Sequence, residues 1–342
     1  MQTEAIRASD NAPFVFHDPA FAALIGRSAR LEHVVATDAH EGPAYMGAED
    51  ALHFTSLPRL VDDPAPGERS VAIRRVELDG YRFPVDADAV TTVVERSNVA
   101  NGITFGGDGR LLVCEQGSRS DHAGIAAIDP RTGAREVVVD AWSGLRLNSP
   151  NDIVVAPDGA LWFTDPTYGY LQGFRPEPQI GDYVYRYDPA TGRLGVVADG
   201  FDKPNGLAFS PDGSVLYVTD SGANQEAGSY YVTRPHHIVA FDVVGGRHLR
   251  TARLVAVTTP GFPDGIKVDI EGRVYASAFN GGPGLLPGGR PDRRDPPSRR
   301  RELHVRRSRQ TTSFSSLPTP RSGRRSQTRR EPDSCQSYVH AG

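Results

Sequence analysis

Short apolar runs alternate with polar residues along most of the chain, and five stretches repeat one order of features. Each has a short polar motif, an apolar run, an acidic turn that usually contains Gly, and a second apolar run. The stretches are EGPAYMGAEDALHFTS (41–56), NGITFGGDGRLLVCEQG (101–117), NDIVVAPDGALWFTDPTYG (151–169), NGLAFSPDGSVLYVTDSG (205–222) and DGIKVDIEGRVYASA (264–278). Period-two alternation rich in Val, Tyr, Phe and Trp predicts β-strands and disfavours a helical solenoid.

The turns and the spacing of these stretches predict the architecture. D-G and E-G pairs between apolar runs are typical of hairpin turns, because Gly accepts a positive φ. The later stretches start at residues 101, 151, 205 and 264, a period of about 50 residues. A period of this length with about four short strands is typical of a β-propeller blade. We therefore predict an all-β propeller with five blades in residues 37–282, after an N-terminal extension (1–36).

Propeller geometry gives the polar motifs a common direction. The innermost strand of each blade lines a central channel, so Glu41, Asn151, Asn205 and Asp264 are expected at equivalent positions around it. Two carboxylates and two amide carbonyls form an all-oxygen set that suits a hard cation such as Ca²⁺. Thiols and clustered histidines are missing from the motifs, which argues against a zinc or copper site. Each Asn-Gly or Asp-Gly pair, taken alone, is also a common turn; the repetition favours a shared metal.

Composition narrows the class of protein. The 342 residues include 36 Gly and 27 Pro, which favours turns and short strands. No apolar run is long enough to span a membrane, and we expect no signal peptide, so a cytoplasmic location is predicted. Residues 1–282 hold 24 Lys plus Arg against 37 Asp plus Glu, which argues against nucleic acid as a partner. The chain lacks a G-x-S-x-G motif, so a serine hydrolase is not expected.

Several of the motifs together resemble one known family. HEGPAY, LNSPNDIVVAPDGALWFTDPTYGY, KPNGLAFSPDGSVLYVTDSG and FPDGIKVDIEGRVYASA resemble the SMP-30/gluconolactonase/LRE-like family, over about residues 36–282. The family is similar to six-bladed calcium-dependent lactonases and to phosphotriesterases of the diisopropylfluorophosphatase type. The resemblance implies metal ligands at Glu41, Asn151, Asn205 and Asp264. It implies Ca²⁺ as the cofactor, although Zn²⁺ and Mn²⁺ also occur in similar proteins.

The resemblance also implies a reaction, the opening of a sugar lactone. The metal polarises the ester carbonyl, and a carboxylate takes a proton from the attacking water. Asp264 is the expected base and Glu41 the second choice. Asp152 is expected to orient a ligand or a water. Further residues are predicted to be substrate-facing or structural: Asn101, Glu115, Arg119, Asp165 and Tyr168.

Two other functions stay open at the level of sequence. The same metal could serve phosphotriester hydrolysis. A non-catalytic binding propeller is the third reading, because the sixth blade is missing from the recognisable sequence. Rates on gluconolactone and on a phosphotriester distinguish the two enzyme classes.

The last 60 residues differ in composition from the rest. Residues 283–342 contain 14 Arg, five acidic residues, one Phe and neither Ile nor Trp. Such a segment cannot bury the apolar surface of a blade, which predicts a disordered basic tail. A second interpretation is a shifted reading frame, because GC-rich codons read one nucleotide out of frame can encode a family-like sixth blade. We favour the frameshift, and thus a sixth blade lost or scrambled in this chain.

Overall fold

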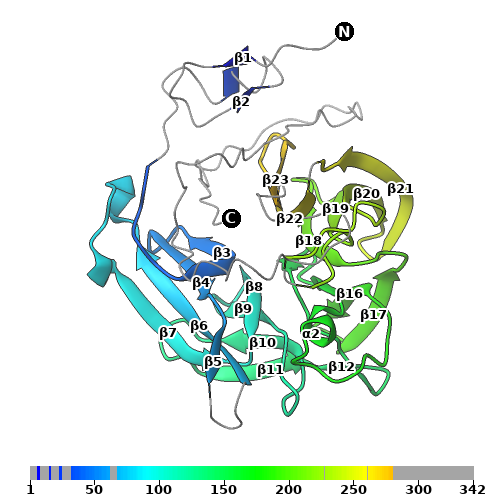
Figure 1. Ribbon diagram of the computed structural model, residues 1–342, viewed down its shortest axis with the longest axis horizontal. Coiled ribbons are helices and arrows are strands. Elements are labelled where there is room, and N and C mark those ends of the chain that lie inside the picture. Colours follow the sequence, from blue (N-terminus) through cyan, green and yellow to red (C-terminus); the bar gives the residue numbers. More distant parts are fainter. Residues whose placement is uncertain are drawn as a thin grey trace, which may run out of the picture.

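The computed structural model describes residues 6–7, 15–16, 23–24, 32–61, 68–226, 228–259 and 261–279. From residue 39 onward the described strands form antiparallel sheets arranged around one axis (Figure 1). Blade 1 contains β3 (Ala39–Met46), β4 (Ala51–Ser56), β5 (Arg59–Val61), β6 (Glu68–Glu77) and β7 (Val90–Ser97). Blade 2 contains β8 (Ala100–Phe105), β9 (Leu111–Glu115), β10 (Gly124–Ile128) and β11 (Arg135–Val139). Blade 3 contains β14 (Ile153–Val155), β15 (Leu161–Asp165), β16 (Tyr183–Asp188) and β17 (Arg193–Ala198).

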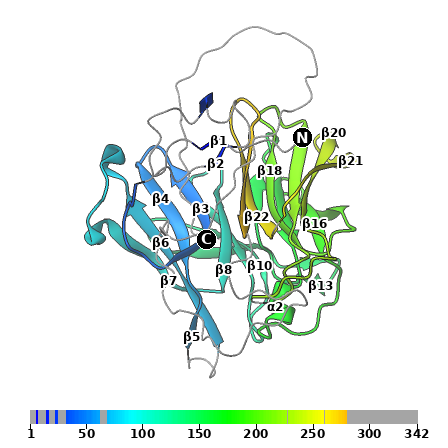
Figure 2. The same ribbon diagram turned by 45° about the horizontal axis from the view of Figure 1, so that its top comes forward.

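Blade 4 contains β18 (Pro204–Phe209), β19 (Val215–Asp220), β20 (His237–Val244) and β21 (His248–Val257), and β22 (Phe262–Val268) pairs with β23 (Val274–Phe279). The inner strands β3, β8, β18 and β22 lie closest to the axis in Figure 1 and stay on the inner side of their sheets in the tilted view of Figure 2. The smaller elements are β1 (Ile6–Arg7), β2 (Val15–Phe16), η1 (Asp79–Tyr81), η2 (Ala87–Ala89), β12 (Ala141–Trp142), β13 (Leu145–Arg146) and α2 (Tyr168–Leu171).

The hairpin turns between the first and second strands form as the sequence predicts. Gly109, Gly159, Gly213 and Gly272 all have positive φ, at 81°, 81°, 68° and 81°. Blade 1 has Asp50 at this turn, with φ 45°. Glycine accepts this conformation at little cost, whereas Asp tolerates it less well. The local turn chemistry thus sets the register of each inner hairpin.

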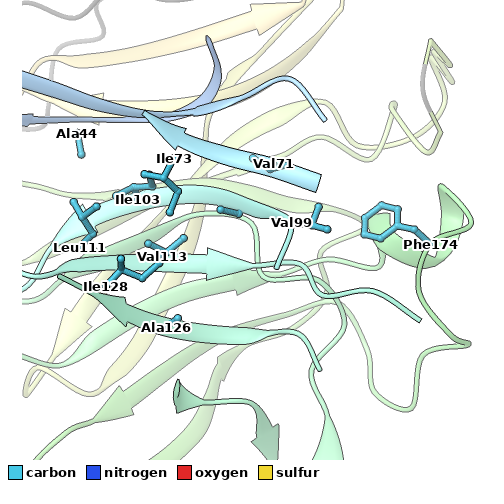
Figure 3. Packing of buried hydrophobic residues seen from close by; sticks show 11 residues of the cluster. Ala44, Val71, Ile73, Val99, Ile103, Leu111, Val113, Ala126, Ile128 and Phe174 are labelled. Carbon is cyan, nitrogen blue, oxygen red and sulfur yellow. The ribbon is translucent and has the colours of Figure 1, made fainter. Parts of the chain in front are cut away.

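The core lies between the blades, because each sheet packs one face against the next sheet. The cluster between blades 1 and 2 joins residues of β6, β8, β9 and β10, and Phe174 from the loop after α2 closes one end (Figure 3). Similar clusters lie between blades 2 and 3 and between blades 3 and 4, around Phe163, Tyr185 and Trp162. A fourth joins β19 and β20 to Ile266 and Val274. Burial between sheets stabilises the ring and sets the relative positions of the inner strands.

Two of the predictions concern residues outside the described part of the chain. The proposed frameshifted tail, residues 283–342, lies wholly outside it, and so does most of the N-terminal extension. In the described residues, no helix is both long and apolar enough to cross a membrane.

Candidate active site

The innermost strand of most blades is irregular where the sequence predicts a channel-facing polar side chain. Pairing between the first and second strands skips residues around Glu41 in β3, Asn101 in β8, Asn205 in β18 and Asp264 in β22. A bulge interrupts the alternation of a strand and re-aims a side chain. Asn101, Asn205 and Asp264 therefore leave the regular ladder at equivalent places, and Glu41 keeps its partner between two irregularities.

One cavity gathers the polar residues at these positions. It is lined by Glu41, Asn101, Asn151, Asp152, Asn205 and Asp264, and its empty volume of about 1270 Å³ includes space open to solvent. Asn151 and Asn205 are only 8% and 7% exposed, whereas the side chain of Glu41 is 30% exposed. The structure thus brings together all four predicted metal ligands, together with Asn101 and Asp152.

Glycine follows Asn101 and Asn205 because another blade lies against the backbone there. A Cβ on Gly102 would lie 2.4 Å from the carbonyl oxygen of Asn151, and one on Gly206 would lie 2.6 Å from that of Asp264. Both glycines lie inside strands, β8 and β18, and neither is at a turn. The turn interpretation of these pairs is therefore wrong: glycine allows the inner strands of adjacent blades to approach closely.

Hydroxyl groups on the second strands support the same backbone. Thr164 Oγ1 donates to the carbonyl of Asn205 at 2.7 Å, and Thr219 Oγ1 donates to that of Asp264 at 2.8 Å. Thr55 Oγ1 donates to the carbonyl of Glu41 at 3.0 Å within its own blade. These bonds hold the main chain of three candidate ligands, so the cavity wall is positioned by three threonines that are not among its lining residues.

Asp152 takes the place where the other repeats have glycine, and its carboxylate joins blade 3 to blade 4. Oδ1 accepts from the backbone N–H of Ile153 at 2.9 Å, and Oδ2 accepts from that of Leu207 at 3.2 Å. It lines the cavity beside Asn151. Asp152 therefore fixes the distance between the inner strands that carry Asn151 and Asn205.

Asp165 is buried and does not line the cavity. Its carboxylate accepts from the backbone N–H groups of Asn148 and Ser149, at 2.9 and 2.8 Å. Burial raises the pKa of Asp165 to about 7, against the opposite effect of these hydrogen bonds. Asp220 holds the equivalent loop of blade 4 through the N–H groups of residues 202 and 203. Asp165 thus anchors the loop that leads to Asn151, and a direct substrate contact is not what the structure shows.

Glu115 and Arg119 also lie away from the cavity. Glu115 is 1% exposed and pairs with Arg135, whose Nε lies 2.9 Å from Oε1. It lines a separate cleft between blades 1 and 2. Arg119 is exposed and donates to the carbonyl of Gly173 at 2.8 Å. Glu115 ends the second strand of blade 2 and Arg119 follows it, and both residues contact neighbouring chain segments instead of the channel.

Tyr168 links blade 3 to blade 4. It begins α2, is buried, and its phenol O–H donates to the carbonyl of Ser221 at 3.5 Å. Burial, with a smaller effect of the Asp264 carboxylate, raises the pKa of Tyr168 well above its usual value, so the phenol stays protonated. Tyr168 thus joins the segment after the second strand of blade 3 to Ser221 in blade 4, and it is not among the residues that line the cavity.

Sequence reasoning missed Arg175, which fixes the loop after α2. Its guanidinium is 7% exposed and donates to the backbone carbonyls of Ser118, Asp121, Leu147 and Asn148, at 2.7 to 3.0 Å. A buried guanidinium of this kind needs a full set of acceptors. No spacing or motif in the sequence signals this role, because all four carbonyls belong to other segments.

The side chains in the cavity fit a hard divalent cation. Within the described residues, no cluster of three or more His, Cys, Asp and Glu side chains is arranged to hold a metal. The cavity combines three carboxylates, those of Glu41, Asp152 and Asp264, with the amides of Asn101, Asn151 and Asn205, and carboxylate and amide oxygens are donors that Ca²⁺ accepts. His40, whose Nδ1 lies 3.9 Å from Oε1 of Glu41, is the nearest imidazole to that carboxylate.

Comparison with known proteins assigns the family. The model for the SMP-30/Gluconolactonase/LRE-like region matches residues 40–285. The chain belongs to this family. A gluconolactonase from Zymomonas mobilis is 32% identical over 269 residues, which cover 77% of this chain and 71% of that protein. Lactonohydrolase oryL from Aspergillus oryzae is 29% identical, with 79% and 64% covered.

The solved structures agree with the family assignment. A gluconolactonase from Xanthomonas campestris is 31% identical, with a TM-score of 0.59 over 81% of this chain and 84% of that one. A putative gluconolactonase in another solved structure is 28% identical, with a TM-score of 0.54. The predicted membership of the SMP-30/gluconolactonase/LRE-like family and the all-β propeller fold are therefore confirmed.

Proposed function

We propose that this protein hydrolyses a sugar lactone or a similar cyclic ester at a divalent metal, with Ca²⁺ as the first choice. The observation that carries the proposal is the single cavity that gathers Glu41, Asn151, Asn205 and Asp264 from four different blades. Two relatives, of which the matches cover 71% and 64%, are a gluconolactonase and a lactonohydrolase, which supports the same substrate class.

Glu41, Asn151, Asn205 and Asp264 are the residues proposed to hold the metal. When bound, a divalent cation supplies Lewis-acid polarisation of the ester carbonyl. The protein contributes a fixed cavity wall, since the backbone carbonyls of Glu41, Asn205 and Asp264 each accept a hydrogen bond from a threonine hydroxyl. Side chains that extend from a backbone held in this way need little reorganisation during the reaction.

Asp264 is the proposed general base. Its carboxylate takes a proton from water as the water oxygen attacks the lactone carbonyl carbon. The bond between that carbon and the ring oxygen then breaks, and the proton passes to the ring oxygen, which leaves a hydroxy acid. Glu41 is the second candidate for this role, and His40 beside it can orient its carboxylate.

The test is hydrolysis of a lactone panel by the full chain, followed as acid release above the spontaneous rate. Activity on gluconolactone is expected to be lost with a chelator and restored by Ca²⁺, with Zn²⁺ and Mn²⁺ added in parallel. A phosphotriester serves as the comparison substrate. The proposal is contradicted if only the phosphotriester is hydrolysed above its spontaneous rate. It is also contradicted if lactone hydrolysis persists after chelation.

A further inference from the structure

A second pocket lies beside the loop that leads to Asn151, and it shares no lining residue with the channel cavity. Its empty volume is about 560 Å³, including space open to solvent. The segment before the inner strand of blade 3 and the segment after α2 form its wall, among them Arg146, Asn148, Arg175 and Glu177. None of these residues has a part in the proposed hydrolysis. A pocket with a few well-placed polar groups is typical of a ligand site, so the partners of these groups indicate what it can bind.

Asn148 gives this pocket a buried acceptor. Its side-chain Nδ2 donates to the backbone carbonyls of Asp165 and Gly181, at 3.2 and 2.9 Å. Because a carbonyl oxygen only accepts, these two bonds fix which end of the amide is the nitrogen. The other end, Oδ1, is buried and has no hydrogen-bond partner among the described residues, and Asn148 as a whole is 6% exposed. A buried acceptor of this kind needs a donor from a ligand or from water.

Arg175 gives the same pocket a donor. A guanidinium has five N–H groups, and four of those of Arg175 donate to the backbone carbonyls of residues 118, 121, 147 and 148. The remaining N–H, on Nη2, has no acceptor in the part of the chain that the structure describes. Since Nε binds the carbonyl of Asn148 itself at 3.0 Å, the remaining donor and the Asn148 amide belong to neighbouring side chains.

Arg146 adds a second positive charge to the pocket wall. It is exposed, and its guanidinium forms no hydrogen bond or ion pair with a described residue. Burial lowers the pKa of Arg175; Asp165 opposes this effect and Arg146 adds to it, so the two guanidinium groups are close enough to repel each other. A carboxylate between them would accept from both and relieve that repulsion. Glu177, on the exposed rim, offers an acceptor for further hydroxyl groups.

We infer that this pocket binds a small hydroxy acid, with its carboxylate at Arg146 and Arg175 and a hydroxyl group donating to Oδ1 of Asn148. Such a molecule carries both the acceptor and the donor that the two buried groups need. Hydroxy acids are also the product class of the proposed hydrolysis, so the source of the ligand rests on the proposed function, whereas the binding itself does not. Asn148 is three residues before Asn151, which places the bound acid at the loop that enters the channel cavity.

The test measures the binding of gluconate to the full chain by calorimetry, with a chelator present so that no metal in the channel can hold a carboxylate. Arg146→Gln removes a charge and most of its donors from an exposed position, so the Kd for gluconate is expected to rise about tenfold. Arg193→Gln is the matched control, because Arg193 is also exposed, begins β17 of blade 3 and does not line the pocket. Its Kd should stay within about twofold of the parental value.

Two further ligands separate the parts of the site. Hexanoate has the carboxylate without hydroxyl groups, and glucose has hydroxyl groups without the carboxylate. Each is expected to bind at least about tenfold more weakly than gluconate. The inference is overturned if hexanoate binds as tightly as gluconate, or if Arg146→Gln binds gluconate like the parent. It is also overturned if gluconate gives no heat of binding, which would mean that the buried groups hold water only.

These outcomes are separate from those of the lactone assay. An active lactonase that does not bind gluconate in the presence of chelator contradicts the hydroxy-acid site alone. An inactive chain that binds gluconate through Arg146 contradicts the proposed function alone.

Discussion

Blades 3 and 4 begin with nearly the same motif and use it differently. Both place an asparagine in the cavity, Asn151 and Asn205, and both hold the preceding loop with a buried aspartate, Asp165 and Asp220. The next residue differs. Gly206 leaves room for the backbone of Asp264, whereas Asp152 extends its carboxylate to the backbone N–H of Leu207.

The difference shows that residues at equivalent positions in a repeat can have different structural roles. In blade 4 the residue after the asparagine is Gly206, which has no side chain, so the inner strands of two blades can approach closely. In blade 3 the same position holds a carboxylate that links two strands. Both solutions fix neighbouring inner strands, and the asparagine beside each keeps its place in the cavity. The following predictions test which part of this arrangement serves chemistry and which serves packing.

The largest effect is expected on the rate of lactone hydrolysis, when the proposed general base is removed. Asp264→Asn gives the fifth blade an amide like those of blades 3 and 4, and removes a base and a charge. Lactone hydrolysis should fall about 10²- to 10⁴-fold, with little change in the thermal midpoint. Initial rates on gluconolactone and thermal unfolding measure the two effects. If the variant keeps the parental rate, Asp264 is not the base, and Glu41→Gln becomes the variant to measure.

Gly206→Ala tests the close contact in blade 4. The added Cβ meets the backbone carbonyl of Asp264 at 2.6 Å, which cannot be relieved by a side-chain rotation. We expect the free energy of unfolding to fall by about 3 kcal/mol, measured by urea denaturation. Gly195→Ala is the control, because nothing lies within 4 Å of its Cβ position. Equal stabilities of the two variants would refute the packing role of Gly206.

Asp165 gives blade 3 a pH dependence. Its pKa is raised to about 7 in the folded protein, above the 3.8 of the free side chain. Between these values the folded state holds a proton that the unfolded state has lost, so this group's contribution to stability falls as pH rises. The free energy of unfolding of Asp165→Asn, minus that of the parent, should therefore rise by about 2 kcal/mol between pH 5 and pH 7.5.

Urea denaturation of both proteins at the two pH values measures this difference. Asp220→Asn, in the equivalent loop of blade 4, serves as the matched control for loss of a loop-anchoring carboxylate. A stability difference between Asp165→Asn and the parent that is the same at both pH values would show that the buried carboxylate is ionised throughout.

The smallest effect is expected for the link between the blades. Asp152→Asn keeps one oxygen acceptor and replaces the other with NH₂, so either the Ile153 or the Leu207 N–H loses its acceptor. A buried donor without a partner costs about 1–3 kcal/mol, and we expect about 1.5 kcal/mol here. The free energy of unfolding from urea denaturation is the measurement. An unchanged value would mean that the carboxylate does not join the two blades.

The strands, the turns and the repeat could be predicted from local sequence. Gly109, Gly159 and Gly213 follow Asp between apolar runs, and a positive φ there depends only on the residue itself. The equivalence of Asn151 and Asn205 followed from the period of the repeat. Their common cavity was predicted because propeller geometry brings equivalent positions to one axis.

Other roles depended on residues that meet only in the folded protein. Glu115 and Asp165 both end the second strand of their blade, yet one pairs with Arg135 and the other accepts from two backbone N–H groups. In the sequence, Gly206 looks like a turn residue. Only the fold shows that the backbone of Asp264 lies against it. The hydrogen bond from Tyr168 to the carbonyl of Ser221 spans two blades.

The sequence by itself therefore determined where the chain turns, which faces of the strands are apolar and which polar residues repeat. The tertiary structure alone decided which of those polar residues share the cavity and which hold a loop. The physical reason is range: φ preferences and alternation act within a few residues, whereas hydrogen bonds and close contacts depend on partners that are distant in sequence.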